Sequence, residues 1–358
     1  MNIPNNLKIF VLAPSIESKD ENINYYYDFT QSIEEYTKVF KELQLNWQWI
    51  PIKIDNYKEV ILKIKNNCDA NDIRALFFNL CDGDDLNDAP GISVIQYLNE
   101  LDLKYTGSDV YFYEITTSKR NMKIAFDEHN IPHAAWQFIK NRNDIDEKIF
   151  EKIGLPLIVK PSVSGGSMGV GVKNVVHNFD ELKEQVEKIL NGYRGWNLKA
   201  GGIIAERFIN GAEFTVLITG NYNDPQKAHI YTPVERVFHS SLKEEEKFLS
   251  FDRLWEIYED EAPMPNGENF YEYALPDKNL VERIKQTSWN AYKACKGKGY
   301  TRVDLRMDKI TNKLYVLEVN AQCGLSEDEN FTSIGAILKF NNVSFTSLVK
   351  EIIENSLR

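Results

Sequence analysis

The 358-residue chain has few cysteines and histidines, and their arrangement excludes several kinds of site. It contains four cysteines and five histidines. No two cysteines form a CxxC pair, and no histidine lies at zinc-ligand spacing from a cysteine, so we do not expect a structural zinc site. Isolated cysteines are typical of reduced thiols in a cytosolic protein. We expect Cys323 to pack and not to act as a nucleophile, because no histidine lies near it to activate it.

Long apolar runs and an excess of basic charge are also missing. No apolar run approaches the roughly 18–20 residues that span a bilayer, and the polar start of the chain, Met1 to Lys8, lacks the pattern of a signal peptide. The formal net charge is −11, and an acidic surface repels phosphate backbones. We therefore predict a cytoplasmic protein that binds neither membranes nor nucleic acid.

The composition is that of a folded protein, with 43% hydrophobic and 27% charged residues. The length suits two or three domains around a cleft. The first hundred residues alternate short apolar runs with segments of helical periodicity, which predicts a doubly wound α/β sheet. The expected strands are 8–12, 47–54 and 73–80, and the expected helices are 28–45, 57–67 and 92–101. Asp82-Gly83-Asp84-Asp85 follows the third strand, at the edge where such sheets bind ligands.

The rest of the chain has an antiparallel, α+β character. We expect a helix over 116–130 and a strand over 170–176. Asn210-Gly211 predicts a tight hairpin turn that joins the strands 203–209 and 213–219. Helices are also expected over 179–191, 278–295 and 344–356.

Two polar strands late in the chain predict a cluster of oxygen ligands. If 301–307 and 314–319 pair around a turn, Asp304 lies opposite residue 317 or 318. Asp304, Glu318 and Asn320 then converge on one surface, where a hard cation such as Mg²⁺, carried with nucleotide phosphates, would relieve the repulsion between the carboxylates. A solvated strand face would show the same alternation, so the pattern alone leaves both interpretations open.

A glycine-rich loop, residues 161–171, joins two expected strands. Glycine lets backbone N–H groups approach phosphate oxygens, but the loop lacks the ending of a P-loop and the fingerprint of a dinucleotide site. Lys160 ends the strand that enters the loop, and Lys123 lies on the preceding helix, so two ammonium groups can neutralise phosphates. The alternatives are a flexible connection for the loop and a solvated helix face for Lys123.

A third group of residues suits a nucleoside. Glu206 and Phe208-Ile209 end a strand whose backbone can supply a donor and an acceptor beside an apolar slot for adenine. Glu213, just past the turn, can accept hydrogen bonds from ribose hydroxyls. Each of these is also an ordinary strand residue.

Taken in order, these segments resemble the ATP-grasp superfamily, in particular the D-alanine–D-alanine ligase branch. The resemblance extends from about residue 8 to 356. The segments that carry it are Tyr105 to Ser108, Lys123, Leu157 to Ser162, Gly165 to Gly169, Ala205 to Ile209, Gly211 to Val216, Thr301 to Asp304, Glu318 to Asn320 and Gly324.

The resemblance implies an ATP-grasp fold with three domains and a homodimeric assembly. Residues 1–108 would form a Rossmann-like amino-terminal domain, and 109–205 a central subdomain with the glycine-rich loop. Residues 206–358 would form a carboxy-terminal domain with the metal site, and ATP would lie between the last two.

The resemblance also implies residue roles. ATP would be bound by Lys123, Lys160, Gly165, Gly166, Ser167, Met168, Gly169, Glu206, Arg207, Phe208, Ile209 and Glu213. Two Mg²⁺ ions, with Mn²⁺ as an alternative, would be bound by Asp304, Glu318 and Asn320. Arg302, Ser167 and Gly324 would act at the reacting groups. The implied reaction converts a small-molecule carboxylate to an acyl phosphate with release of ADP, and an amine then displaces phosphate to form an amide or dipeptide.

The sequence departs from the family pattern in the substrate regions. Where the family has small hydroxyl residues, after the Asn-x-x-x-Gly segment, this sequence reads Gly324-Leu325-Ser326-Glu327-Asp328-Glu329, and its three acids would repel a carboxylate. We therefore expect a second substrate other than D-alanine, unless this acidic stretch points outward. The mobile-loop Lys-Tyr pair is also absent, and Arg253 is a candidate replacement for its charge. An ATP-grasp phosphotransferase and a nucleotide-binding protein without turnover remain alternative functions.

Overall fold

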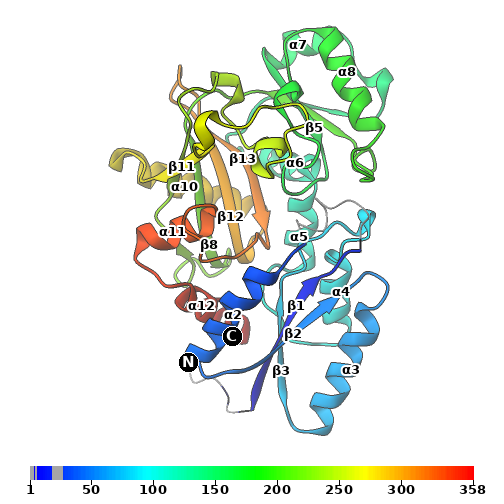
Figure 1. Ribbon diagram of the computed structural model, residues 1–358, viewed down its shortest axis with the longest axis vertical. Helices are drawn as coiled ribbons and strands as arrows, with labels where there is room; N and C mark the ends of the chain where they lie inside the picture. Colours follow the sequence, from blue (N-terminus) through cyan, green and yellow to red (C-terminus); the bar gives the residue numbers. More distant parts are fainter. Residues whose placement is uncertain (1–3, 5, 18–26) are drawn as a thin grey trace.

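The structure is a computed structural model that describes residues 4, 6–17 and 27–358. Residues 1–3 and 5 of the polar amino-terminal segment lie outside this description. The molecule is elongated, and its described residues form three β-sheets (Figure 1). The amino-terminal sheet lies at one end, the sheet with β5 at the other, and the sheet with β12 between them.

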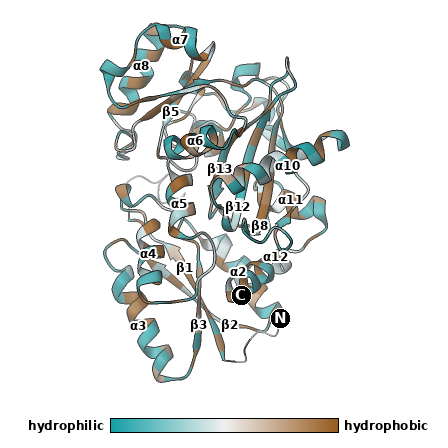
Figure 2. Cartoon of the chain, turned by 180° about the vertical axis from the view of Figure 1, so that it is seen from behind, coloured by the Kyte–Doolittle hydropathy of each residue, from teal (hydrophilic) through white to brown (hydrophobic). Residues whose placement is uncertain are grey.

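The amino-terminal sheet is parallel, with the order β2-β1-β3, and confirms the predicted alternation. Its strands are β1 (Leu7–Pro14), β2 (Asn46–Ile52) and β3 (Arg74–Asn79). Its helices are α2 (Thr30–Glu42), α3 (Tyr57–Ala70) and α4 (Ile92–Glu100). Ile9 and Val11 face one apolar cluster and Phe10 and Leu12 another, so β1 is buried on both faces, as a continuous apolar run requires. Figure 2 shows these apolar strands inside more polar helices.

The second sheet has four strands in the order β4-β7-β5-β6. They are β4 (Trp136–Ile139), β5 (Leu157–Pro161), β6 (Val175–Val176) and β7 (Ile203–Arg207). Helices α7 (Lys148–Ile153) and α8 (Phe179–Leu190) pack on it through one apolar cluster.

The predicted strand over 170–176 is wrong for most of its length. Residues 172–174 form a 3₁₀ turn, η3, and within the predicted range only the two residues of β6 belong to a strand. The Asn174 side chain bonds to the Gly171 N–H at 2.8 Å, the Val159 carbonyl at 2.6 Å and the Gly169 carbonyl at 3.1 Å. These side-chain bonds satisfy backbone groups that a strand would satisfy by pairing.

The third sheet has six strands, with the order β11-β10-β8-β12-β13 and β9 paired to β8. The strands are β8 (Glu213–Asn221), β9 (His229–Ile230), β10 (Val234–Phe238), β11 (Tyr271–Ala274), β12 (Lys298–Met307) and β13 (Leu314–Ala321). Helix α10 (Lys278–Ala294) packs on one face, and α11 (Ser333–Asn341) and α12 (Phe345–Leu357) pack on the other. Helix α11 was not predicted.

The predicted hairpin turn at Asn210-Gly211 is wrong. The strand before it, β7, belongs to the four-stranded sheet, and the strand after it, β8, belongs to the six-stranded sheet. The segment is therefore the crossing between the two antiparallel sheets. Gly211 has φ +150°, and a Cβ there would lie 1.9 Å from the Met307 carbonyl oxygen, so glycine is required by close backbone approach as well as by conformation.

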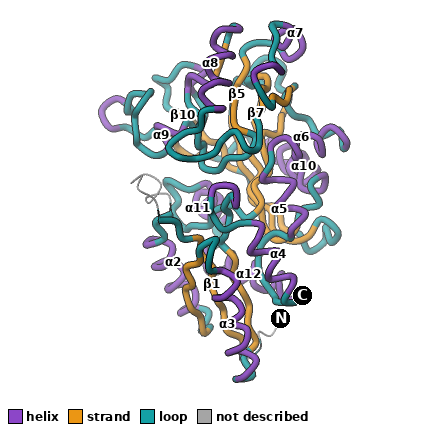
Figure 3. The backbone as a smooth tube through the Cα atoms, turned by 90° about the vertical axis from the view of Figure 1, so that its right-hand side faces the viewer, coloured by secondary structure: helices purple, strands orange, loops and turns teal. Residues whose placement is uncertain are grey.

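The helix predicted over 116–130 is two helices, α5 (Val110–Thr117) and α6 (Lys119–Glu128). Ser118 ends the first and caps the second, because its side chain accepts a hydrogen bond from the Asn121 N–H. Although these helices fall in the range predicted for the central subdomain, 109–205, Phe112 and Phe126 pack in the core of the six-stranded sheet. Figure 3 shows α5 and α6 along one side of the molecule.

The remaining short elements lie mostly in loops. They are α9 (Phe251–Leu254) and the 3₁₀ turns η1 (Asp85–Asn87), η2 (Arg142–Asp144), η3 (Val172–Asn174), η4 (Glu244–Glu246) and η5 (Pro265–Gly267). No helix in the described part of the chain has both the length and the apolar character needed to cross a membrane.

Candidate active site

The hairpin of β12 and β13 brings the predicted metal ligands together. Asp304 lies directly opposite Glu318, and Arg302 opposite Asn320, which confirms the predicted register. The Asn320 Nδ2 donates to Asp304 Oδ2 at 2.9 Å, and the Arg302 Nε lies 3.1 and 3.0 Å from the two Asp304 oxygens. Asp304 is buried, so Arg302 and Asn320 take the place of water as its hydrogen-bond donors.

The donor set fits a hard cation that arrives with a ligand. Two carboxylates and a carboxamide supply only oxygen ligands, which Mg²⁺ prefers, and Mg²⁺ usually completes its shell with water and substrate phosphates. Across the described residues there is no group of three or more His, Cys, Asp or Glu side chains that could hold a metal alone. Asp304, Glu318 and Asn320 therefore suit a metal bound jointly with a phosphate ligand.

Two of the predicted phosphate ligands converge on one buried carboxylate. Lys123 on α6 and Lys160 on β5 both form ion pairs with Glu206 on β7, the second at 2.5 Å. Lys123 is 1% exposed and Glu206 is 3% exposed. Burial would raise the pKa of Glu206, but the ammonium groups of the two lysines outweigh burial and lower it to about 2. Glu206 is therefore ionised at neutral pH and holds both lysines in place.

Lys119 is a third basic residue of this region, which the sequence analysis missed. Its Nζ lies 3.1 Å from the Ser164 carbonyl oxygen in the glycine-rich loop and 3.9 Å from Glu318 Oε2. It therefore lies between the loop and the carboxylate pair. The signal was present, because Lys119 precedes Lys123 by four residues and lies on the same face of α6. Burial lowers the pKa of Lys119, and Glu318 offsets part of this effect.

The glycine-rich loop is closed by contacts from the segment 249–255. Ser167, with φ +61°, donates its hydroxyl to the Leu249 carbonyl at 2.8 Å. The Trp255 indole N–H donates to the Gly166 carbonyl at 2.8 Å. The Met168 side chain is buried in the core of the four-stranded sheet, so only its backbone is placed to meet a ligand. The loop and this segment form one covering layer.

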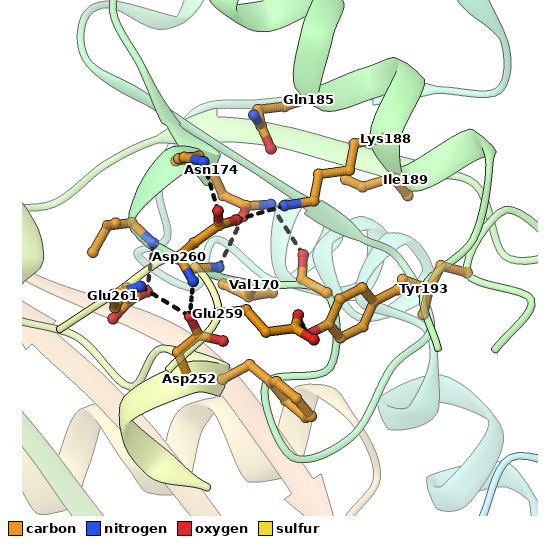
Figure 4. A pocket seen from close by; sticks show the side chains of 16 residues that line it. Val170, Asn174, Gln185, Lys188, Ile189, Tyr193, Asp252, Glu259, Asp260 and Glu261 are labelled. Carbon is orange, nitrogen blue, oxygen red and sulfur yellow. Dashed lines mark hydrogen bonds and ion pairs between the residues drawn. The ribbon is translucent and has the colours of Figure 1, made fainter. Parts of the chain in front are cut away.

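Two acidic residues after this segment, Asp260 and Glu261, attach the layer to η3 and α8 (Figure 4). Asp260 pairs with Lys173 at 2.6 Å and with Lys188 at 3.0 Å, and Glu261 Oε1 accepts from the Val172 N–H at 2.9 Å. A cavity of about 40 Å³ lies beneath these contacts. Of the predicted nucleotide ligands, the cavity shares Gly169 in its lining.

The predicted adenosine ligands lie at the end of β7. Phe208 packs against Phe248, with ring centroids 5.8 Å apart, and the Ile209 carbonyl accepts from Arg306 Nη1 at 3.1 Å. Glu213 is buried and forms ion pairs with Arg236 and with Arg306, the second at 2.5 Å. The ribose role of Glu213 therefore requires that it accept further bonds beside two arginines.

Arg207 does not join this group. Its guanidinium pairs with Asp308 and lies 5.9 Å from the centroid of the Tyr315 ring. The Arg253 guanidinium also has partners outside this group, and it forms ion pairs with Glu246 at 3.0 Å and with Glu261 at 3.3 Å.

The formal charges of the side chains in this region have a positive sum. They comprise six basic residues and four carboxylates, Lys119, Lys123, Lys160, Arg236, Arg302, Arg306, Glu206, Glu213, Asp304 and Glu318. The chain as a whole carries −11. An excess of two positive charges in one partly buried region of an acidic protein favours an anionic ligand.

The segment after β13 contains Gly324 and the acidic stretch. Gly324 is exposed, and a Cβ there would meet nothing within 4 Å, which leaves room for a substrate. Glu327 pairs with Lys38 and Glu329 with Lys339, while Asp328 Oδ1 accepts from the Asn330 and Phe331 N–H groups. The three acids therefore have partners of their own.

Cys323 beside them is buried, and burial raises the pKa of its thiol to about 12. The thiol is therefore protonated at neutral pH. This agrees with packing and not with nucleophilic attack.

The sequence is similar to those of known proteins. The chain is 26% identical over 263 residues to D-alanine–D-alanine ligase of Borrelia duttonii, which covers 72% of this chain and 65% of that protein. It is 32% identical over 276 residues to the ligase of Treponema denticola, covering 73% of this chain and 65% of that protein. The matched regions thus span slightly less than two thirds of the length of these relatives.

Solved structures show the same fold. The D-alanine–D-alanine ligase of Bacillus anthracis in complex with ATP has a TM-score of 0.67 and 20% identity, with 98% of this chain and 97% of that chain covered. The VanG D-Ala:D-Ser ligase of Enterococcus faecalis has a TM-score of 0.69 and 17% identity, with 98% and 100% covered. The predicted α/β fold of the ATP-grasp type is confirmed. Residues 126–354, well over half of the chain, match the family model of the D-ala D-ala ligase C-terminus, and the chain therefore belongs to the D-alanine–D-alanine ligase family.

Proposed function

We propose that this protein is an ADP-forming ligase that uses ATP and Mg²⁺ to join a carboxylate to an amine through an acyl phosphate. One observation carries the proposal: Asp304 and Glu318 lie directly opposite each other, with Asn320 bonded to Asp304, beside three lysines that can bind phosphates. Family membership and the names of the relatives support the same reaction class.

The basic side chains would bind the phosphates, and the acidic side chains would bind the metal. Lys119 and Lys160, both held by carboxylates, would bind phosphate oxygens, and the N–H groups of Gly165 to Gly169 would approach from above. Bound Mg²⁺ would neutralise the phosphate charge. Asp304 would then bind the metal, and Arg302 would be released from Asp304 to face the anionic acyl centre.

The covering layer would exclude water from this reaction. Ser167 and Gly166 bind residues of the segment 249–255, so closing the loop also closes that segment. An acyl phosphate is hydrolysed by water, and a closed layer over it favours attack by the amine.

We also propose that the amine is not D-alanine. In the stretch that holds the second carboxylate in the family, this chain has Ser326 followed by Glu327, Asp328 and Glu329, and the Ser326 hydroxyl donates to Glu35 Oε1 at 2.7 Å. Lys38 and Lys339 offset the charge of Glu327 and Glu329, so repulsion is a weaker support than the engagement of this hydroxyl by Glu35. Turnover measured over a panel of amines tests this point, and efficient use of D-alanine would exclude it.

The reaction is tested by an ADP-release screen over pairs of carboxylates and amines, with mass detection of the product. We expect release that depends on both substrates, and loss of at least about 100-fold in Asp304→Asn because charge stabilisation of the transferred phosphate is removed. Release without any amine dependence would favour the phosphotransferase, and unchanged ATP turnover in Asp304→Asn would favour a nucleotide-binding protein. A homodimer, also proposed, is tested by light scattering after size exclusion.

A further inference from the structure

Gln322, two residues after Asn320, joins the end of β13 to the amino-terminal part of the molecule with one buried side chain. It is 1% exposed. Its Nε2 donates to the Asn79 carbonyl at 2.7 Å, and its Oε1 accepts from the Ser108 N–H at 3.0 Å and the Ser108 hydroxyl at 3.2 Å. The amide thus links the end of β13 to the end of β3 and to the segment that begins α5.

The backbone around this amide is specialised for the contact. Gln322 has φ +59°, a conformation that residues other than glycine adopt rarely. Gly107, with φ +93°, faces the amide so closely that a Cβ there would lie 2.1 Å from Gln322 Oε1. A left-handed glutamine and a glycine opposite it are both needed for this contact, which is unusual for a residue that merely fills a core.

The positions that Gln322 connects are the places where the two substrates would meet ATP. Asn79 ends β3, and the carboxyl ends of parallel strands are where such sheets bind ligands. Asn320 and Arg302 lie opposite each other on the neighbouring hairpin. The Asn79 N–H also donates to the Thr106 hydroxyl at 3.1 Å, so the junction is hydrogen-bonded on both sides of Gln322.

A second attachment lies four residues further along. The Ser326 hydroxyl donates to Glu35 Oε1 at 2.7 Å, and the Glu327 N–H approaches the same oxygen at 3.3 Å. Glu35 is on α2 and is 5% exposed. The segment 322–327, with the open Gly324 in its middle, is therefore attached at both ends to the amino-terminal domain.

We propose that Gln322 is a positioning residue that sets the distance between the carboxylate-substrate site at the end of β3 and the metal and Arg302 on the hairpin. This inference rests on the proposed ligase function. The Gln322 amide fixes the position of the amino-terminal domain relative to β13. The acyl centre formed at the end of β3 is thereby placed next to Arg302 and the amine at the hairpin.

The test uses the full chain with Gln322→Glu and Gln322→Met. Gln322→Glu keeps the oxygen that accepts from Ser108, but it replaces the amide that donates to the Asn79 carbonyl with a second acceptor oxygen. Gln322→Met keeps the length of the side chain and has no group that bonds to Asn79 or Ser108. Gln286→Glu, at an exposed position of α10, is the matched control. We expect kcat for ADP release to fall about 10–100-fold, since a misplacement of about 1 Å has that effect. The KM for the carboxylate should rise, and the dissociation constant for MgADP should stay within about twofold, because Gln322 contacts neither the glycine-rich loop nor the lysines.

Hydrogen exchange of the residues 77–82 and 106–109, measured without substrates, provides a second readout. Both variants should exchange faster there, and the control should not. Unchanged kinetics in both variants would overturn the proposal, as would an equal loss in kcat and MgADP affinity, which would indicate general unfolding. If the wild-type protein released no ADP with any carboxylate, the ligase function would fail, while unchanged exchange in the variants would separately refute the anchoring by Gln322.

Discussion

Replacing Glu206 by glutamine should destabilise the fold by an amount that depends on pH. Glu206 is the common partner of Lys123 and Lys160, and its pKa is lowered from 4.5 to about 2 in the folded protein. A shift of this size corresponds to about 3 kcal/mol of stability at pH 7. Glutamine keeps the shape of the side chain and removes the charge, so the variant should lose this contribution.

The sign of the pH dependence follows from the direction of the shift. Because the folded-state pKa of Glu206 lies below the unfolded-state value, the contribution is complete above about pH 5 and declines as the pH falls toward 2. The difference between wild type and Glu206→Gln should therefore shrink from about 3 kcal/mol at pH 7 to about 2 kcal/mol at pH 3.5.

Urea unfolding followed by tryptophan fluorescence, at several pH values between 7 and 3.5, measures this difference. Glu282→Gln, at an exposed position of α10, is the control and should change the free energy of unfolding by less than about 0.5 kcal/mol. A Glu206→Gln variant as stable as the wild type at pH 7 would refute the reasoning. It would mean that the cost of burying the carboxylate equals its attraction to the two lysines.

Two further substitutions test the site and the crossing between the sheets. Lys119→Met should raise the KM for ATP about 10–100-fold, because a charge-assisted bond to phosphate contributes about 1.5–3 kcal/mol. Steady-state kinetics measure this KM, and the control Lys293→Met, at an exposed position, should leave it unchanged. Gly211→Ala should lower the free energy of unfolding by about 2–3 kcal/mol, since its Cβ would lie 1.9 Å from the Met307 carbonyl. Gly267 has φ +70° but open space around it, so Gly267→Ala should lower the free energy of unfolding by about 1 kcal/mol. Denaturation curves measure both variants, and an equal loss in the two would contradict the role of the close contact between residue 211 and the Met307 carbonyl.

The amino-terminal sheet and the late hairpin could be predicted because local pattern determines them. The buried run of β1 and the helical spacing of α2 are each complete within a short segment. In the hairpin, the two-residue period of a strand fixes which side chains share a face. That period, with the turn between the strands, limited the residue opposite Asp304 to 317 or 318, and the structure has Glu318 there.

The crossing at Asn210-Gly211 could not be predicted because a local signal does not identify the sheet to which a strand belongs. Asn-Gly favours a turn wherever it occurs, but β7 pairs with β4 and β5, and β8 pairs with β10 and β12. Similarly, the spacing of Lys119 and Lys123 shows only that they share a face of α6. Which of the two lysines forms an ion pair with Glu206 depends on the position of β7, which comes more than 80 residues later in the chain.

The acidic stretch illustrates the same difference for charge. In the sequence, Glu327 and Glu329 read as unpaired acids beside the substrate, yet their partners Lys38 and Lys339 lie on α2 and α11. One of these helices was not predicted at all, and the other lies almost 300 residues earlier. The net effect of a charged segment therefore depends on tertiary partners that composition does not reveal.

The ion pairs of the site also suggest why a nucleotide and a metal would bind together. Arg302 is held by Asp304, and Lys119 lies 3.9 Å from Glu318, so a phosphate must compete with carboxylates for these cations. A metal that takes Asp304 and Glu318 as ligands removes that competition and frees both cations at once. Each ligand thus strengthens the binding of the other through the same carboxylates. Titrations of ADP with and without Mg²⁺ should show this coupling in the wild type, and it should be much smaller in Asp304→Asn, where one of the shared groups no longer carries charge.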